Sequence, residues 1–269
     1  MIPTAFTLLA VSAVALTGGC GRKEVDMFTV TAHRGASAAA PENTIAAIER
    51  AIGFGAHFAE VDVHMSRDGR VVLMHDESVN RTTDGQGNVW DLTLEELKGL
   101  DAGSWFAEEF RGEPVPTLRE AIDLARGKIK LNIEIKVSRD EPDIAEKVVG
   151  IIREEAFEDD CMVTSFDRET VEEVKRLAPD ITTGHIFGKG YEETVFGGGW
   201  EVLSCSKDIV DEDFVARAGD AGKSVHVWTV NDEPTMIRLI GIGVDGIITN
   251  KPDLLFQVLS ASMRRGSER

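Results

Sequence analysis

Short apolar segments alternate with segments of helical periodicity eight times between Met27 and the end of the chain. Parallel strands require crossover connections, which amphipathic helices normally supply, so this alternation indicates a parallel sheet covered by helices. A chain of 269 residues with eight such repeats fits a single (β/α)8 barrel, which takes about 250 residues. We therefore predict an α/β fold of the TIM-barrel type. The expected strands are residues 28–32, 58–63, 129–135, 162–165, 182–186, 201–204, 224–230 and 246–249.

Helical periodicity marks most of the connections between these strands. Asp167 and Asp232 stand immediately before two helical segments and are suitable N-cap residues, because their carboxylates can accept hydrogen bonds from the first backbone amides of a helix. The connection after residues 182–186 lacks a clear long helix. The expected helices are residues 42–53, 118–126, 144–155, 168–177, 213–221, 233–241 and 253–260.

Residues 76–116, after the second expected strand, do not fit the repeat and form an insertion. A capping-box sequence at residues 93–96 predicts a short helix within it. Long inserted segments often act as lids or binding loops, so the aromatic side chains here either shape the mouth of a site or pack the insertion onto the barrel. We favour packing. The aromatic residues are Trp90, Trp105, Phe106 and Phe110.

Functional side chains of a barrel gather at the carboxyl ends of its strands. Glu60 and Asp62 are two residues apart on the second expected strand and therefore point to the same face. Because a buried carboxylate without a partner is costly, the pair indicates a cation between them. The alternative is a hairpin whose carboxylates face solvent. A turn at residues 66–69 and a short strand at 71–74 would bring His75 to the end of the same hairpin.

Two further strands carry matching chemistry at their ends. Asn132, Glu134 and Lys136 alternate along the third expected strand and point inward together, and the first strand is followed by His33 and Arg34. Each residue type has an ordinary structural role when it occurs singly. Together they offer three carboxylates for Mg²⁺ or Ca²⁺, two imidazoles for acid and base catalysis, and two cationic side chains for a phosphate.

The overall charge narrows the range of ligands. Lys and Arg total 29 against 47 Asp and Glu, which gives a formal net charge of −18. Such a chain is unsuited to binding nucleic acid through phosphate neutralisation, so we expect no nucleic-acid partner. An anionic substrate would need a local positive site, which Arg34 and Lys136 can provide.

The first 22 residues differ in character from the rest and are expected to lie outside the fold. Residues 1–20 are apolar and end in Leu16-Thr17-Gly18-Gly19-Cys20, which resembles the lipobox of a bacterial lipoprotein signal, with Cys20 as the lipidated residue. This predicts an extracytoplasmic protein anchored to a membrane. The segment before the apolar run has no Lys or Arg, so the alternative is a true start at Met27 and a cytoplasmic protein. The catalytic domain is then 27–262, followed by a polar tail at 263–269.

The two remaining cysteines are expected to be buried free thiols. Cys161 begins one expected strand and Cys205 follows the end of another. In a parallel barrel they would lie at opposite ends, too far apart for a disulfide.

An ordered set of motifs covers nearly all of residues 27–253 and resembles the glycerophosphodiester phosphodiesterase family. The order and the approximate spacing of the set make the resemblance specific. The motifs are His33-Arg34-Gly35, Pro41-Glu42-Asn43-Thr44, Glu60-x-Asp62, Asp68-Gly69, His75-Asp76, Arg81-Thr82-Thr83, Glu134-x-Lys136, Trp228-Thr229-Val230-Asn231 and Gly243-Val244-Asp245-Gly246.

The resemblance implies a (β/α)8 barrel with an insertion after the second strand, a divalent cation, and hydrolysis of glycerophosphodiesters to glycerol 3-phosphate and an alcohol. By position it implies metal ligands at Glu60, Asp62 and Glu134 and catalytic histidines at His33 and His75. It also implies phosphate contacts from Arg34 and Lys136 and a wall against the glycerol carbons from Trp228. His64 shares the face of the acidic pair, and we expect it at the rim of the site rather than among the ligands. His57, His185 and His226 are expected to be structural.

Several alternatives stay open at this stage. The attacking oxygen is either water or the substrate's own glycerol 2-hydroxyl, and His33 is favoured as base with His75 as acid. A phosphodiesterase of the phospholipase C or D type, acting on phosphoinositides or lysophospholipids, is the nearest other function. A non-catalytic lipoprotein that binds phosphodiesters is the alternative outside enzymes.

Overall fold

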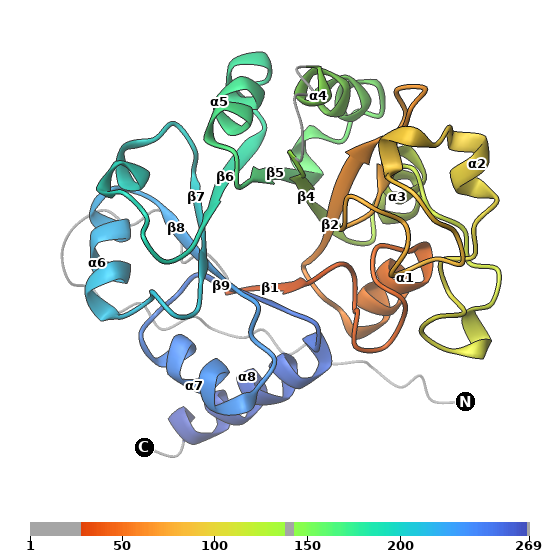
Figure 1. Cartoon of the computed structure of the whole chain (residues 1–269). Coiled ribbons are helices and arrows are strands. Elements are labelled where there is room, and N and C mark those ends of the chain that lie inside the picture. Colours follow the sequence, from red (N-terminus) through yellow and green to blue (C-terminus); the bar gives the residue numbers. More distant parts are fainter. Residues whose placement is uncertain (1–27, 138–142, 268–269) are drawn as a thin grey trace, which may run out of the picture.

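Eight parallel strands close into a ring in the computed structural model, which describes residues 28–137 and 143–267 (Figure 1). β1 pairs with both β9 and β2, and this double pairing closes the barrel. The predicted (β/α)8 barrel is therefore confirmed. The strands are β1 (Thr29–Ala32), β2 (Phe58–Met65), β4 (Lys130–Ile135), β5 (Cys161–Ser165), β6 (Thr182–Phe187), β7 (Val202–Ser206), β8 (Ser224–Trp228) and β9 (Gly246–Thr249), with β3 (Val71–Leu73) added antiparallel to β2.

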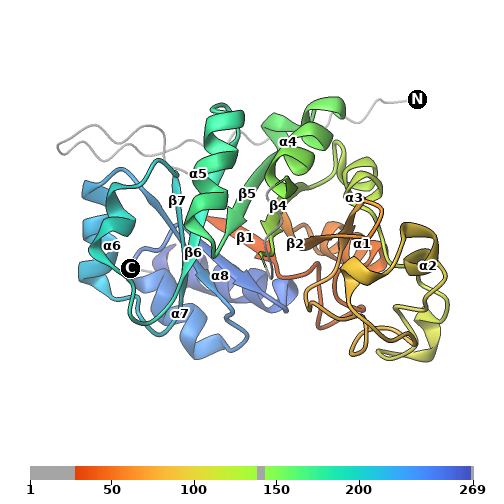
Figure 2. The same cartoon turned by 45° about the horizontal axis from the view of Figure 1, so that its top comes forward.

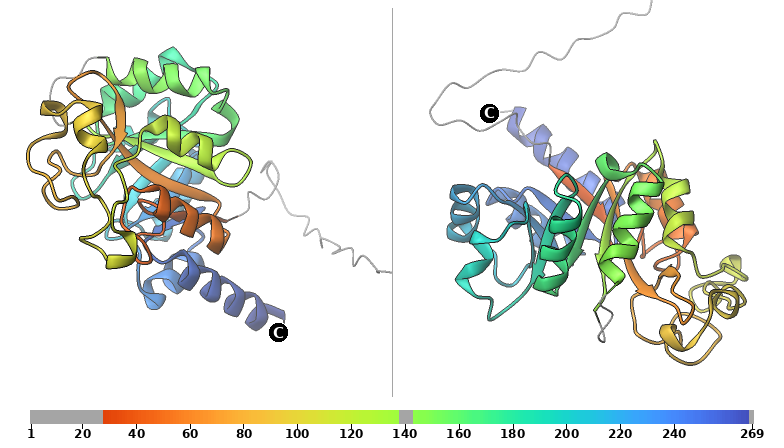
Figure 3. Two further views of the ribbon diagram at one scale, coloured as in Figure 1. Left: turned by 90° about the vertical axis from the view of Figure 1, so that its right-hand side faces the viewer. Right: turned by 90° about the horizontal axis from the view of Figure 1, so that it is seen from above.

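Helices surround the barrel, as the views in Figures 1 and 3 show. Asp167 and Asp232 cap two of them, accepting hydrogen bonds from the backbone amides of Thr170 and Thr235. The crossover after β6 contains only a short 3-10 helix, η4 (Glu193–Gly197), in agreement with the sequence. The long helices are α1 (Ile45–Phe54), α3 (Leu118–Ala125), α4 (Ile144–Glu154), α5 (Arg168–Leu177), α6 (Glu212–Asp220), α7 (Glu233–Gly241) and α8 (Pro252–Ser267).

The structure describes only one of the two predicted end segments. Residues 1–22, with Cys20, are outside the described residues. α8 continues to Ser267 and so includes most of the segment that the sequence sets apart as a polar tail. Among the described residues, no helix combines the length and the hydrophobicity that a membrane span requires.

The insertion after β3 builds a small unit of its own on the flank of the barrel (Figure 2). It contains η1 (Val89–Asp91), α2 (Leu94–Lys98) and η2 (Glu108–Phe110). The capping box is present, because Thr93 accepts from the amide of Glu96 and the Glu96 carboxylate accepts from the amide of Thr93. Buried apolar side chains form its core: Val72, Met74, Val79, Val89, Leu97, Ala102 and Val115.

The aromatic side chains of the insertion contact one another. Phe106 lies edge-on to Trp105 at 5.7 Å and to Phe110 at 5.6 Å between ring centroids. None of the three lines the pocket described below. These three rings therefore pack against one another within the insertion, whereas the sequence predicted that they pack the insertion onto the barrel.

Alternation along the strands separates an apolar outer layer from a polar interior. Val61 and Val63 of β2, like Ile133 and Ile135 of β4, are buried in the apolar layer between strands and helices. Each fully buried aliphatic side chain of this kind stabilises the fold by roughly 1.5–3 kcal/mol. The intervening residues point into the barrel, which is how one register of β2 and β4 places carboxylates together. Cys161 and Cys205 are both buried and free, as predicted.

Candidate active site

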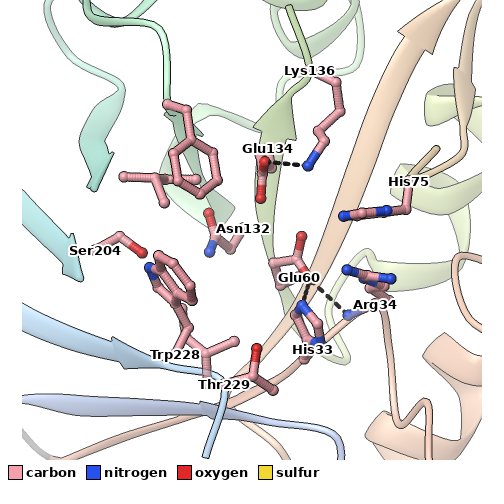
Figure 4. A pocket seen from close by; sticks show the side chains of 13 residues that line it. His33, Arg34, Glu60, His75, Asn132, Glu134, Lys136, Ser204, Trp228 and Thr229 are labelled. Carbon is pink, nitrogen blue, oxygen red and sulfur yellow. Dashed lines mark hydrogen bonds and ion pairs between the residues drawn. The ribbon is translucent and has the colours of Figure 1, made fainter. Parts of the chain in front are cut away.

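A pocket of about 140 Å³ opens at the carboxyl ends of the barrel strands (Figure 4). The structure brings together there all the site residues that the sequence predicted within the described part of the chain. Asp62 does not line the pocket itself but contacts a residue that does, with Oδ1 lying 3.3 Å from the Lys136 ammonium. The predicted residues that line the pocket are His33, Arg34, Glu60, His75, Glu134, Lys136 and Trp228.

Glu60, Asp62 and Glu134 form an acidic triad at the base of this pocket. Oxygen atoms of the three carboxylates all lie within 4.8 Å of one another. Their closeness follows from the register, because Asp62 on β2 pairs directly with Glu134 on β4. All three residues are buried or nearly so, at 3%, 1% and 9% exposure.

The triad carries more negative charge than its surroundings neutralise. Burial first, and then repulsion from Asp62, raises the pKa of Glu134 to about 7, and the same two causes raise the pKa of Glu60 well above its ordinary value. Burial alone would also raise the pKa of Asp62, but Lys136, His75 and Arg34 together lower it. Oε1 of Glu60 is buried without a hydrogen-bond partner. Three hard oxygen donors with one unpartnered atom fit a divalent cation such as Mg²⁺ or Ca²⁺.

Arg34 is held against two members of the triad. Its backbone amide donates to Oε2 of Glu60 at 2.7 Å, and its Nε lies 3.5 Å from Oδ2 of Asp62. The chain turns sharply here, with Arg34 and Gly35 at φ of 54° and 74°. A Cβ at position 35 would lie 2.6 Å from Ala47, so only glycine fits.

Lys136 supplies the second positive charge from the end of β4. Its ammonium lies 2.7 Å from Oε1 of Glu134 and 3.3 Å from Oδ1 of Asp62. Figure 4 shows Lys136, which follows β4, and Arg34, which follows β1, both reaching the pocket, with His75 beside Arg34. Carboxylates of the triad thus hold the positively charged side chains of Arg34 and Lys136 at the pocket.

The two histidines have different partners. Nδ1 of His33 lies 2.7 Å from Oδ1 of Asn250. Because an amide oxygen only accepts, Nδ1 must carry the proton, and Nε2 is left facing Glu60 at 4.0 Å. Burial, and next the charge of Arg34, lowers the pKa of His33 to about 4, so this imidazole is neutral near pH 7.

His75 is backed by a carboxylate instead of an amide. Its Nδ1 lies 2.7 Å from Oδ1 of Asp76. Hydrogen bonds from Arg81, the largest cause, and from His75 lower the pKa of Asp76, so that carboxylate is ionised. A carboxylate in this position accepts a hydrogen bond from Nδ1 and so fixes the orientation of the ring.

Other polar partners of the site carried no role in the sequence reasoning. Asn43 donates from Nδ2 to Oδ2 of Asp62 at 2.8 Å and accepts from the Asp62 amide at 3.0 Å, in a backbone conformation with φ of 56°. Asn250 directly follows β9, and Asp76 lies next to His75. Asp76 and Asn250 lie near strand ends, and Asn43 lies just before α1 within a motif that the sequence shows, but which loop atoms would meet is a matter of turn geometry.

The far wall of the pocket is partly aromatic. Phe166, which follows β5, lies edge-on to Trp228 at 5.7 Å between ring centroids. Phe166 is 53% exposed, and the sequence reasoning did not single it out. Ser204 of β7 and Asn132 of β4 also line the pocket. The predicted wall at Trp228 is thus a pair of rings above polar side chains.

The prediction for His64 was correct in excluding it from the ligands but wrong in placing it at the rim. His64 is 1% exposed and lies within the β2–β3 hairpin, where its Nε2 is 3.3 Å from the carbonyl oxygen of His75. It pairs with Val72, which packs in the core of the insertion, so its face of the hairpin is covered and is not an open rim. It is also not a member of the acidic triad.

Comparisons with known proteins agree with this geometry. Residues 33–254 match the glycerophosphoryl diester phosphodiesterase family. A glycerophosphodiester phosphodiesterase of Caldanaerobacter subterraneus is 40% identical over 86% of this chain and 97% of its own length, and one of Bacillus subtilis is 32% identical over 87% of each.

Solved structures extend the likeness to three dimensions. A phosphodiesterase of Oleispira antarctica, in complex with the product sn-glycerol-3-phosphate, superimposes with a TM-score of 0.82 at 32% identity, over 87% of this chain and 97% of that one. A crystal structure from Silicibacter pomeroyi gives the same TM-score at 26% identity, over 90% of this chain and 96% of that one. The fold, the ordered motifs and the family match together establish that this chain belongs to the glycerophosphoryl diester phosphodiesterase family.

Proposed function

We propose that this protein hydrolyses glycerophosphodiesters to glycerol 3-phosphate and an alcohol, with a divalent cation and two histidines. The observation that carries the proposal is the convergence, in one pocket, of the acidic triad, two cations and two differently backed imidazoles. The product sn-glycerol-3-phosphate in the related Oleispira structure supports the substrate class.

Glu60, Asp62 and Glu134 are the residues that would hold Mg²⁺ or Ca²⁺. When bound, the cation acts as a Lewis acid on the phosphate oxygens and offsets the negative charge of the triad. Arg34 and Lys136 attract the phosphate and stabilise charge that develops on its oxygens. Both side chains are already oriented by ion pairs to carboxylates of the triad, so little reorganisation is needed on binding.

His33 serves as the base and His75 as the acid. His33 presents an unprotonated Nε2, since Asn250 fixes the proton on Nδ1. It takes the proton of the attacking oxygen. If that oxygen belongs to water, glycerol 3-phosphate forms directly; if it is the glycerol 2-hydroxyl, a cyclic phosphate forms first and water then opens it to glycerol 3-phosphate. His75, whose ring is oriented by the Asp76 carboxylate, gives a proton to the departing alkoxide.

The second candidate substrate class is lysophospholipid or phosphoinositide. It is favoured by the exposed ring of Phe166 beside Trp228, which offers apolar surface at the mouth of the pocket. Equal or faster turnover of a lysophospholipid than of glycerophosphocholine would make the lipid the preferred substrate.

The first experiment measures glycerol 3-phosphate released from glycerophosphocholine with Mg²⁺, with Ca²⁺ and with EDTA. We expect release that requires a cation and disappears in Glu60→Ala. Glu169→Ala, which changes an exposed glutamate on α5, is the matched control and should act like the wild type. Near wild-type turnover by His33→Ala would overturn the acid-base assignment. Binding of the diester without any turnover would favour the non-catalytic alternative.

The membrane anchor remains a separate proposal that rests on sequence alone. Lipidation at Cys20 would place the enzyme on the extracytoplasmic face of a membrane, where phosphodiesters from lipid breakdown arise. Incorporation of a labelled fatty acid and recovery in the membrane fraction should both be lost in Cys20→Ala. Incorporation that persists in that variant, or a mature chain starting at Met27, would contradict it.

A further inference from the structure

We propose that Arg81, contributed by the insertion, is a positioning residue that fixes the orientation of the His75 and Arg34 side chains relative to each other. The proposal rests on the function proposed above, in which His75 is the acid and Arg34 contacts the phosphate. Arg81 does not line the pocket itself, so it would act through its neighbours.

The guanidinium of Arg81 lies between two carboxylates and bonds both in a forked manner. Nε and Nη2 donate to the two oxygens of Asp76 at 2.6 and 2.9 Å. Nη1 and Nη2 donate to the two oxygens of Glu42 at 3.0 and 2.8 Å. Paired bonds of this kind fix orientation as well as charge, which a single ammonium cannot do.

Each carboxylate passes this orientation to a pocket residue. Asp76 uses Oδ1 to accept from Nδ1 of His75 at 2.7 Å. Glu42 uses Oε1 to accept from Nη1 of Arg34 at 2.8 Å. The chain of contacts therefore runs from His75 through Asp76, Arg81 and Glu42 to Arg34.

The exposure of Arg81 argues for positioning rather than for stability. Its side chain is 44% exposed, against 13% for that of Glu42. Exposed ion pairs contribute little to folding, typically about 0–1 kcal/mol. The network nevertheless ends at two residues of the pocket, and through it the insertion reaches both of them. The insertion would thus take part in catalysis without its aromatic residues entering the pocket.

The choice of leaving group can separate the effect of Arg81 on His75, through Asp76, from its effect on Arg34, through Glu42. An alkoxide must receive a proton as it departs, whereas 4-nitrophenolate departs without one. Loss of orientation at His75 should therefore slow hydrolysis of glycerophosphocholine more than hydrolysis of glycerol 4-nitrophenyl phosphate. Loss of orientation at Arg34 should slow both equally, because both substrates carry the same phosphate.

The test compares kcat and KM of four variants on these two substrates. Asp76→Asn should reduce kcat for glycerophosphocholine by about 10–100-fold, the usual effect of removing an orienting partner, with little effect on the aryl substrate. Glu42→Gln should affect both substrates by the same factor. Arg81→Gln should combine the two patterns, and Arg81→Lys should recover part of the activity because it restores charge without the fork.

Arg111→Gln is the matched control. Arg111 is also an exposed arginine of the insertion and is also paired in a forked manner, with Glu108, but it makes no contact with the network. It should leave both substrates unaffected. Melting temperatures of all the variants should stay close to that of the wild type.

The positioning role would be overturned if Arg81→Gln, with a fold that is intact by thermal melting, had the same ratio of kcat on the two substrates as the wild type. Unfolding of Arg81→Gln would overturn it as well, because the residue would then be structural. His75→Ala measured on both substrates keeps the two proposals apart. If that variant shows no leaving-group dependence, the acid role of His75 fails, and with it the function as proposed.

Discussion

The two ends of the barrel both hold a polar cavity, and the larger one is not the active-site candidate. At the amino ends of the strands a cavity of about 360 Å³ is lined by Lys130, Asp180, His226 and other polar residues. The pocket at the carboxyl ends measures about 140 Å³. Volume and polarity therefore do not distinguish the site.

The difference lies in how charge is held. At the amino ends charges are separated or locally satisfied: Asp245 accepts from the amide of Val225, and exposed Lys130 lies 3.8 Å from Asp160. At the carboxyl ends three carboxylates are buried against one another, and among the described residues no other group of acids, histidines or cysteines gathers as closely. Such an arrangement lowers stability, and it marks a functional site for that reason.

The largest effect that would sharpen this comparison is expected at Glu60. Glu60→Gln keeps the size of the side chain but removes a charged donor from the cation site. We expect turnover to fall by about 10³-fold or more, because the cation supplies several kcal/mol of transition-state stabilisation. Activity measured across a range of Mg²⁺ and Ca²⁺ concentrations checks this, and recovery at high cation would show that Glu60 is dispensable.

A smaller effect is expected from a residue that orients the triad. Asn43→Gly suits the positive φ of this position but removes both hydrogen bonds to Asp62. Cation affinity should weaken about 10–100-fold, with most of kcat regained at saturating cation. Calorimetric titration of cation binding gives the affinity directly. An unchanged affinity would mean that the Asp62 carboxylate needs no outer partner.

The cost of the triad should appear in the metal-free protein. Glu134 has a folded-state pKa of about 7 against an ordinary value of 4.5, so the folded state binds its proton more tightly than the unfolded state. Stability in EDTA should therefore fall as pH rises from about 4.5 to about 7. In Glu134→Gln this part of the decline should be absent, and the melting temperature near pH 8 should exceed that of the wild type by a few degrees. Melting temperatures that decline alike with pH in both proteins would contradict the prediction that ionised Glu134 destabilises the metal-free triad.

The smallest effect on activity is expected at the other end of the barrel. Burial lowers the pKa of His226 to about 4 from 6.5, so the unfolded state binds its proton more tightly and stability should fall as pH decreases through this range. His226→Gln should weaken that acid dependence and leave turnover unchanged at neutral pH. The paired measurement is an acid melting series and a standard assay. A loss of turnover in His226→Gln would contradict the conclusion that only the carboxyl ends of the strands form the active site.

The sequence predicted the barrel and the central site residues because both depend on simple periodicities. Alternation along β2 and β4 is enough to place Glu60, Asp62, Glu134 and Lys136 on one inner face. The strand-helix rhythm is enough to place His33 and Trp228 at the same rim. No loop conformation has to be known for either step.

The partners of those residues could not be predicted in the same way. Asn43 meets Asp62 because the chain adopts a left-handed turn, and Asn250 meets His33 across a separation of 217 residues. Arg81 reaches two carboxylates from an insertion whose path no periodicity describes. His64 was misplaced because the face that it shares with Val72 packs against the core of the insertion.

The closure of the ring between β9 and β1 has a consequence for the order in which the chain becomes competent during synthesis. The three carboxylates lie on β2 and β4, which pair directly and belong to the first half of the chain. The orienting partner of His33 arrives only with Asn250, after the last strand. A nascent chain that stops before β9 would possess every residue of the triad and lack the group that sets the His33 tautomer. Ribosome-stalled chains of increasing length should therefore acquire cation binding before turnover, and hydrolysis would report that the ring has closed.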